Sequence, residues 1–96
     1  ADSIPQSAPV LKGRVILLDP GHGGNDPGAM YNGIVEKDLT LAVSLSLRTK
    51  LVALGAKVEM TRDVDSTLTL QERLDQSNNS CPDLFLSIHA NAVGNR

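Results

Sequence analysis

The hydrophobic positions of the chain fall into three short runs and two longer periodic segments. The runs at 14–18, 57–61 and 84–88 have the length and apolar content of β-strands. Between them, residues 36–54 repeat with helical period, and residues 70–78 follow a helix-start signal. The order strand, helix, strand, helix, strand predicts right-handed crossovers and therefore parallel strands.

The three predicted strands differ in pattern. Residues 14–18 do not alternate between polar and apolar side chains, which is typical of a strand covered on both faces. Residues 57–61 alternate more, which places them nearer an edge of the sheet. The sequence thus predicts an α/β fold with an open, mostly parallel sheet and flanking helices.

Both predicted helices carry end signals. The apolar face of the first helix is widened by Leu41, Leu45 and Val52, so we expect deep packing, and Gly55 is placed as the C-terminal cap. Its main stripe, spaced by four, four, four and three residues, is Leu39, Val43, Leu47, Leu51 and Leu54. Thr69 and Glu72 form a capping-box pattern at the start of the second helix.

Composition narrows the range of functions. A chain of 96 residues allows one domain, and we assign residues 1–12, with Pro5 and Pro9, to a tail or linker and residues 13–96 to the domain. The net charge of −2 gives no electrostatic reason to expect nucleic acid, and no apolar run approaches the length of a membrane span. Cys81 is the only cysteine, which excludes an internal disulfide, and we expect it to be small, semi-buried and inert.

The chemistry-bearing residues follow the predicted strands. His22 lies in a loop with four glycines just after the first strand, His89 follows the third strand, and Glu36 begins the first helix. Because ligands bind beyond the carboxyl ends of the strands in open α/β sheets, all three side chains are expected at one rim. Two neutral imidazoles and a carboxylate suffice for a catalytic zinc. The alternatives are hydrogen-bonded or exposed histidines and a glutamate that only complements the helix dipole.

Neighbouring polar residues have more than one interpretation. Asp19 is close enough in sequence to orient an imidazole or to brace the loop. Arg62 could contact substrate, but an ion pair with Asp63 or Asp65 that fixes the loop is favoured. Asn91 is equally suited to bind substrate or to brace the candidate metal loop.

Six sequence blocks in order carry a family resemblance. They are Asp-Pro-Gly-His-Gly-Gly at 19–24, Asp-Pro-Gly-Ala at 26–29, Glu-Lys-Asp-Leu at 36–39, Met-Thr-Arg at 60–62, Leu70 with Arg73, and Ser-Ile-His-Ala-Asn-Ala at 87–92. From about 14 to 92 the chain resembles the zinc-dependent N-acetylmuramoyl-L-alanine amidases of the amidase-3 type. The resemblance implies that His22, Glu36 and His89 bind zinc.

The resemblance also implies a substrate, a reaction and a location. The substrate is peptidoglycan, and the reaction hydrolyses the amide between the lactyl group of N-acetylmuramic acid and L-alanine. Such cell-wall hydrolases, or autolysins, act in the periplasm or at the cell wall of bacteria. An upstream wall-binding or regulatory domain joined through the tail is a further expectation.

One departure from the family pattern concerns the general acid/base. The resemblance implies a phosphorylase/hydrolase-like sheet truncated after its third strand, with the second, catalytic glutamate expected beyond residue 96. Glu59 lies within a predicted strand and Glu72 is a predicted cap, so neither matches it. We therefore expect zinc binding with weak or no hydrolysis. The alternatives are a non-catalytic cell-wall-binding or regulatory module that retains the zinc site, and a different zinc hydrolase such as a deacetylase.

Overall fold

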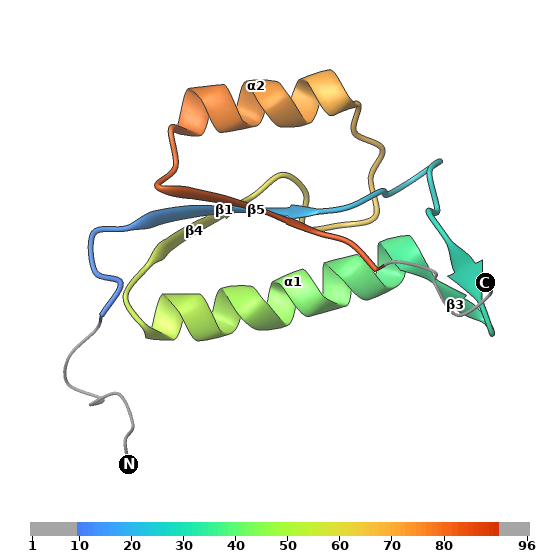
Figure 1. Cartoon of the computed structure of the whole chain (residues 1–96), viewed down its shortest axis with the longest axis horizontal. Helices are drawn as coiled ribbons and strands as arrows, with labels where there is room; N and C mark the ends of the chain where they lie inside the picture. Colours follow the sequence, from blue (N-terminus) through green and yellow to red (C-terminus); the bar gives the residue numbers. More distant parts are fainter. Residues whose placement is uncertain (1–9, 91–96) are drawn as a thin grey trace, which may run out of the picture.

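A three-stranded parallel sheet lies between two helices in the computed structural model, which describes residues 10–90 (Figure 1). The strands of this sheet are β1 (Val15–Pro20), β4 (Lys57–Met60) and β5 (Leu84–Ile88), in the order β4-β1-β5. The helices are α1 (Glu36–Ala53) and α2 (Leu70–Ser80), and a small antiparallel hairpin is formed by β2 (Met30–Tyr31) and β3 (Ile34–Val35). The predicted α/β fold with parallel strands is confirmed.

The central strand β1 is covered on both faces, as its unbroken apolar pattern predicts. Helix α1 covers one face and α2 the other (Figure 1), and Leu17 and Leu18 are almost fully buried. β4 lies at an edge, also as predicted. β1 runs two residues further than expected because Asp19 and Pro20 pair with β5, so Asp19 belongs to the strand and not to the loop.

Helix α1 presents a different face to the sheet from the one predicted. Its buried residues in the N-terminal half are Glu36, Thr40 and Ser44, while Leu39 and Val43 are exposed. Only the C-terminal half of α1 packs on the apolar core, through Leu47 and Leu51, which were both part of the predicted stripe. The core cluster is Ile16, Leu18 and Ala56, packed by Leu11, Leu47, Leu51, Val58, Met60 and Leu86.

The N-terminal half of α1 buries a polar face because it crosses the polar loop that follows β1. The Thr40 hydroxyl donates a 2.8 Å hydrogen bond to the Gly21 carbonyl oxygen, so a polar face is needed where the helix crosses the loop. The expectation that the first turns of α1 bury leucine and valine is therefore wrong. Val52, predicted to widen the buried face, is also exposed.

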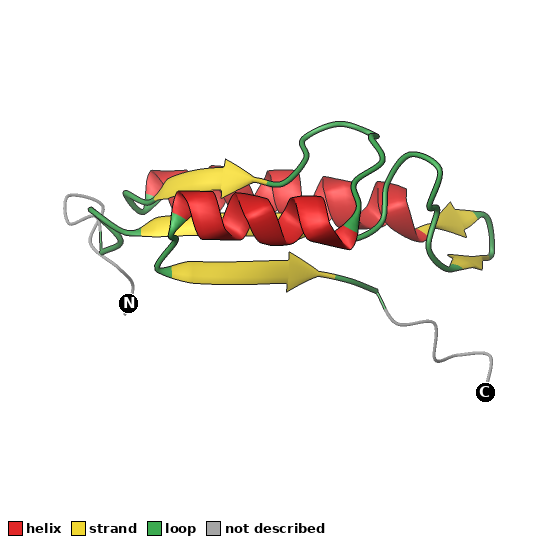
Figure 2. Ribbon diagram, turned by 90° about the horizontal axis from the view of Figure 1, so that it is seen from above, coloured by secondary structure: helices red, strands yellow, loops and turns green. Residues whose placement is uncertain are grey.

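The hairpin β2–β3 lies inside the segment that the sequence pattern assigned to one long loop. Its turn residues Asn32 and Gly33 both have positive φ, at 51° and 79°, as a two-residue hairpin turn requires. Strands of two residues are too short to show a period of two, so only the Asn-Gly pair could have signalled them. The hairpin projects beyond the start of α1, at the end of the molecule toward which the sheet strands point (Figure 2).

Helix α2 has the predicted capping box. The Thr69 hydroxyl accepts from the Glu72 amide at 3.0 Å, and the Glu72 carboxylate accepts from the Thr69 amide at 2.8 Å. The helix runs two residues beyond the predicted end and stops at Cys81, which has a left-handed conformation. Cys81 is exposed and not semi-buried, and its thiol donates to the Asn78 carbonyl at 3.2 Å.

The segment predicted as a tail is described only from residue 10. Leu11 packs against the core and its amide donates to the Leu54 carbonyl at 2.9 Å, so this residue of the predicted tail packs with the domain. Residues 1–9 lie outside the described part. Within residues 10–90, neither helix has the length and apolar content to cross a bilayer.

Removing the α2 cap should weaken the fold measurably. Thr69→Ala leaves the Glu72 amide without its side-chain acceptor, and we expect the free energy of unfolding to fall by about 1 kcal/mol in a urea titration. Thr49→Ala, on the exposed face of α1, removes a hydroxyl of the same kind without removing a cap and should change stability by less than about 0.5 kcal/mol. Equal losses in the two variants would contradict a capping role.

Candidate metal centre

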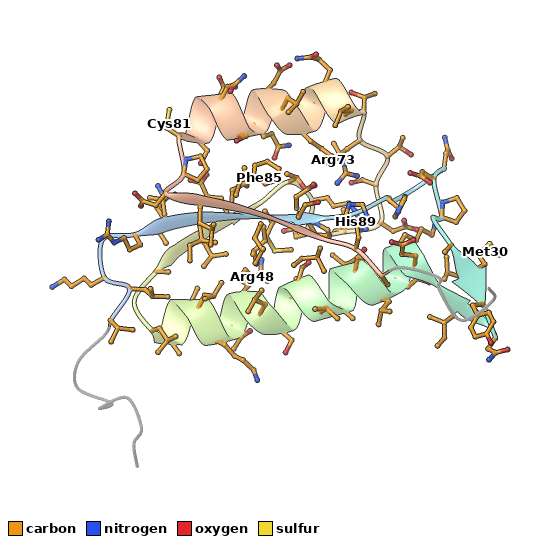
Figure 3. All side chains as sticks on the ribbon, viewed as in Figure 1. Met30, Arg48, Arg73, Cys81, Phe85 and His89 are labelled. Atoms are coloured by element: carbon orange, nitrogen blue, oxygen red, sulfur yellow. The ribbon has the colours of Figure 1, made fainter. Side chains whose placement is uncertain are left out.

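Three side chains from separate elements meet at the carboxyl edge of the sheet. His22 follows β1, His89 follows β5, and Glu36 opens α1, with one ligand atom of each within 4.8 Å of the others. The Glu36 Oε2 atom lies 3.2 Å from His22 Nε2 and 3.5 Å from His89 Nδ1. Figure 3 shows His89 at the end of β5, beside the first turn of α1. Sequence topology therefore placed these three residues together correctly.

The loop after β1 is shaped so that the two imidazoles can approach. The Gly21 amide donates to the Ile88 carbonyl at 2.9 Å, which ties the loop to β5 directly before His89. The His89 ring lies against Gly21, where a β-carbon would come within 2.6 Å of Nδ1. His22 itself has a φ of 66°, an uncommon left-handed conformation for a residue other than glycine. The rings meet edge to face with centroids 5.1 Å apart.

Glu36 is held in its charged form by several donors. Burial raises its pKa, but the amides of Ala29 and Ala90 and then the two imidazoles lower it, and the net direction is downward from the ordinary value. The Ala29 amide donates to Oε1 at 2.9 Å and the Ala90 amide to Oε2 at 3.0 Å. A buried carboxylate with two backbone donors is a fixed anion that faces both imidazoles.

Asp26 orients the ring of His22 and was not assigned this role from the sequence. His22 Nδ1 and the Asp26 carboxylate lie 2.8 Å apart, which leaves Nε2 directed at Glu36. This hydrogen bond, followed by one from the Gly28 amide, lowers the pKa of Asp26. The available signal was the spacing of four residues within a glycine-rich turn. That turn is closed by reciprocal amide–carbonyl hydrogen bonds between Gly23 and Asp26.

Asp19 braces the sheet, and within residues 10–90 it forms no hydrogen bond with either imidazole. It is buried, pairs with the Arg73 guanidinium, and accepts hydrogen bonds from the hydroxyls of Thr61 at 2.8 Å and Ser87 at 2.9 Å. The observed partners differ from both predicted roles, because Asp19 braces the sheet against α2 and not the loop itself. Arg73, from α2, is 8% exposed and lies between that helix and the sheet (Figure 3).

Arg62 is a second buried arginine, only 4% exposed, and it is bound by backbone carbonyls. Burial, followed by the neighbouring Arg73, lowers its pKa. Its Nε donates to His22 O at 2.8 Å, and Arg73 Nη2 donates to the same oxygen at 2.7 Å. The Arg62 guanidinium also donates to four other backbone carbonyls, those of Pro20, Gly21, Lys37 and Val64.

The predicted ion pair between Arg62 and the following aspartates is wrong. Arg62 points into the loop after β1, and Asp65 pairs instead with Lys37 at 2.9 Å while accepting from the Gly24 amide at 2.7 Å. No ion pair of Arg62 with Asp63 or Asp65 occurs within residues 10–90. The sequence pattern could not show this because the acceptors are backbone groups. Asn91, the other predicted neighbour, lies outside the described residues.

A cavity of about 270 Å³ adjoins the cluster on the side of α2. Both histidines line it together with Asp26, while two leucines supply apolar surface. The complete lining is Asp19, Gly21, His22, Asp26, Leu68, Leu70, Arg73, Ser87 and His89. The candidate centre is therefore open to a small molecule from this side.

Fold and cluster together define a class of protein: an α/β domain that gathers metal-capable side chains at the carboxyl edge of a parallel sheet. The sequence profile of one family of this class, described as N-acetylmuramoyl-L-alanine amidase, matches residues 16–96. The chain belongs to this family.

Individual relatives agree with this assignment. The chain is 46% identical over 80 residues to the N-acetylmuramoyl-L-alanine amidase LytC of Bacillus subtilis, covering 83% of this chain and 16% of LytC. It is 47% identical over 81 residues to the sporulation-specific N-acetylmuramoyl-L-alanine amidase of the same organism, covering 82% of this chain and 32% of that protein. Among solved structures, the amidase AmiC2 of Nostoc punctiforme superposes with a TM-score of 0.81 at 38% identity, covering 88% of this chain and 48% of AmiC2. The chain thus spans less than half the length of these three relatives.

Proposed function

We propose that His22, Glu36 and His89 together hold a zinc ion. Zinc bonds of about 2.0–2.1 Å in a tetrahedron separate neighbouring ligand atoms by about 3.3–3.4 Å. The two contacts of Glu36 Oε2 with the imidazole nitrogens, at 3.2 and 3.5 Å, are close to this separation. Two imidazoles and one carboxylate also leave a fourth position for water or substrate, which is typical of catalytic rather than structural zinc.

The surrounding residues prepare these three groups for a metal. Asp26 binds Nδ1 of His22, so that Nε2 is presented as a ligand, and the amides of Ala29 and Ala90 hold the Glu36 carboxylate in place. Arg62 and Arg73 fix the His22 backbone through its carbonyl oxygen. When bound, zinc lowers the pKa of water and polarises a carbonyl oxygen.

The reaction that this arrangement supports best is hydrolysis of the amide between N-acetylmuramic acid and L-alanine in peptidoglycan. Membership of the amidase family supports this substrate, and the three-residue cluster at the edge of the sheet is the observation that carries the proposal. With peptidoglycan as the substrate, we propose that the protein acts in the periplasm or at the cell wall. The chain covers only 16% and 32% of the two Bacillus subtilis relatives, which is consistent with additional wall-binding or regulatory domains.

A non-catalytic zinc module that binds the cell wall is the second candidate. It is favoured by the two other carboxylates lining the cavity, since each is already bound to a neighbouring side chain. Asp19 is paired with Arg73, and Asp26 is hydrogen-bonded to His22.

For the enzyme candidate, in line with the family pattern, we propose that the general acid/base is a glutamate outside these 96 residues.

Zinc titration of the purified chain tests both candidates. We expect one zinc per chain by calorimetry and a rise in the midpoint of thermal unfolding on zinc addition, because a ligand that binds only the folded state stabilises it. Removal of the metal with a chelator should reverse the shift. A chain that takes up no zinc would contradict the proposed centre and with it both functions.

Hydrolysis separates the two candidates. Purified peptidoglycan incubated with the zinc-loaded chain is examined by mass spectrometry for glycan lacking the stem peptide. Zinc-dependent release supports the enzyme, and robust release would identify a proton-transferring group within the chain, with Asp19 and Asp26 the first to replace. Binding without release by the 96-residue chain is expected for both candidates, because the proposed acid/base lies outside it. Binding without release by a chain that includes the proposed glutamate supports the non-catalytic module.

Loss of the Asp26 carboxylate charge should weaken metal binding without unfolding the chain. Asp26→Asn keeps the shape of the side chain but no longer fixes the protonated Nδ1 of His22 as strongly, and we expect zinc affinity to fall by about 10-fold to 100-fold in competition with a fluorescent chelator. Asp63→Asn, an exposed aspartate outside the cluster, serves as the control and should leave the affinity unchanged. Equal affinities of Asp26→Asn and the parent chain would remove Asp26 from the site.

A further inference from the structure

The cavity beside the candidate centre has an apolar side that neither the core nor the zinc proposal explains. Leu68 and Leu70 line it together with both imidazoles. Within the described residues, neither leucine belongs to the core cluster or to the side chains packed against it. Leu70 is 73% exposed at the first position of α2, where the capping box alone accounts for the helix start. Its hydrophobicity therefore has no evident role in folding.

We propose that Leu68 and Leu70 form a subsite for the methyl side chain of the alanine whose nitrogen belongs to the scissile amide. This assignment rests on the proposed function. If the amide carbonyl faces the candidate centre, the groups on either side of the amide must lie within a few ångströms of the imidazoles. The cavity of about 270 Å³ that contains the imidazoles contains the two leucines as well.

The chemistry of the lining decides what the subsite accepts. The other side chains of the cavity are polar, and Asp19, Arg73 and Ser87 are already engaged with one another through ionic or hydrogen bonds. Asp26 is likewise bound to His22. The two leucines are thus the surface against which an aliphatic group gains free energy on burial, while a charged group would lose hydration without a free partner. An alanine methyl fits this requirement.

The test compares two probes that differ by one methyl group. N-acetylmuramoyl-L-alanine and N-acetylmuramoyl-glycine are titrated into the zinc-saturated chain, and binding is followed by NMR of the leucine methyl groups. Burial of one methyl corresponds to a roughly fourfold preference for the alanine probe. We expect this preference in the parent chain and a fall to about equal affinities in Leu70→Gln.

Leu74→Gln is the matched control. Leu74 lies one turn further along α2 and is 46% exposed, but it does not line the cavity. Both substitutions replace an exposed helical leucine by a residue of similar size and helix propensity, so the fold should persist in each, as circular dichroism can verify. Leu74→Gln should keep the preference for the alanine probe.

The outcomes that overturn the subsite are distinct from failure of the proposed function. An unchanged preference in Leu70→Gln, or an equal loss in Leu74→Gln, overturns the subsite. A third probe, N-acetyl-normuramoyl-L-alanine, lacks the lactyl methyl; a Leu70-dependent loss with this probe instead of the glycine probe overturns the assignment to alanine. No binding of any probe overturns the proposed substrate together with the subsite.

Discussion

Arg73→Met should destabilise the fold by about 3 kcal/mol, because it leaves the Asp19 carboxylate buried without its cationic partner. Removal of one member of a buried ion pair typically costs about 3–5 kcal/mol, and the hydroxyls that still donate to Asp19 place the expectation at the lower end of that range. Methionine retains most of the packing volume, so the loss measures the charge and its hydrogen bonds. The measurement is urea denaturation in the presence of a chelator, so that metal binding does not contribute.

Two further variants isolate the pair. Arg14→Met removes an exposed arginine and should change the free energy of unfolding by less than about 0.5 kcal/mol. In the double variant Asp19→Asn with Arg73→Met, the loss should be smaller than the sum of the two single losses, since the second substitution removes the charge that the first one isolates. Additive losses would show that Arg73 acts through the carbonyls of Pro20 and His22 and not through Asp19.

Gly28→Ala should reduce zinc affinity by at least about 100-fold, because the new methyl group displaces two candidate ligands at once. A β-carbon at this position would lie 2.6 Å from His22 Cδ2 and 2.8 Å from Glu36 Oε1, well inside van der Waals contact. The ring and the carboxylate must both move, and the donor of the hydrogen bond from the Gly28 amide to Asp26 moves with them. The affinity is measured by competition with a chelator.

Gly33 offers a closely matched control for the backbone strain. Gly28 and Gly33 have similar positive φ values, 72° and 79°, but a β-carbon at Gly33 meets no atom within 4 Å. Both alanine variants should therefore lose about 1–2 kcal/mol of stability from the left-handed conformation, while only Gly28→Ala should lose zinc. Similar zinc affinities in the two variants would contradict the close approach of Gly28 to the candidate ligands.

The architecture and the candidate ligands could be predicted because both depend on long-range regularities of the sequence. Short apolar or alternating runs predicted the strands, and parallel topology then required His22 and His89 to leave the sheet at the same edge as the start of α1. The capping box of α2 could be recognised because its two residues lie three positions apart. These features are independent of the details of side-chain packing.

The parts that could not be predicted depend on backbone acceptors and local geometry. Nothing in the residue pattern indicates that Arg62 binds carbonyl groups instead of Asp63 or Asp65. Similarly, the polar inner face of α1 at Thr40 reflects the loop that it crosses, which hydrophobic periodicity does not record. The hydrogen bond between Asp26 and His22 could not be predicted without knowing that the backbone of His22 is left-handed.

The way in which Arg62 and Arg73 hold the loop has a consequence for protein engineering. Both guanidinium groups donate hydrogen bonds to the carbonyl oxygen of residue 22, a group common to every amino acid. The identity of the side chain at that position is thus separable from the shape of the loop, within the residue types that tolerate a left-handed backbone. Asparagine at position 22 is too short to reach the place of the imidazole Nε2 atom, so it should remove this metal ligand while the loop that carries it keeps its shape.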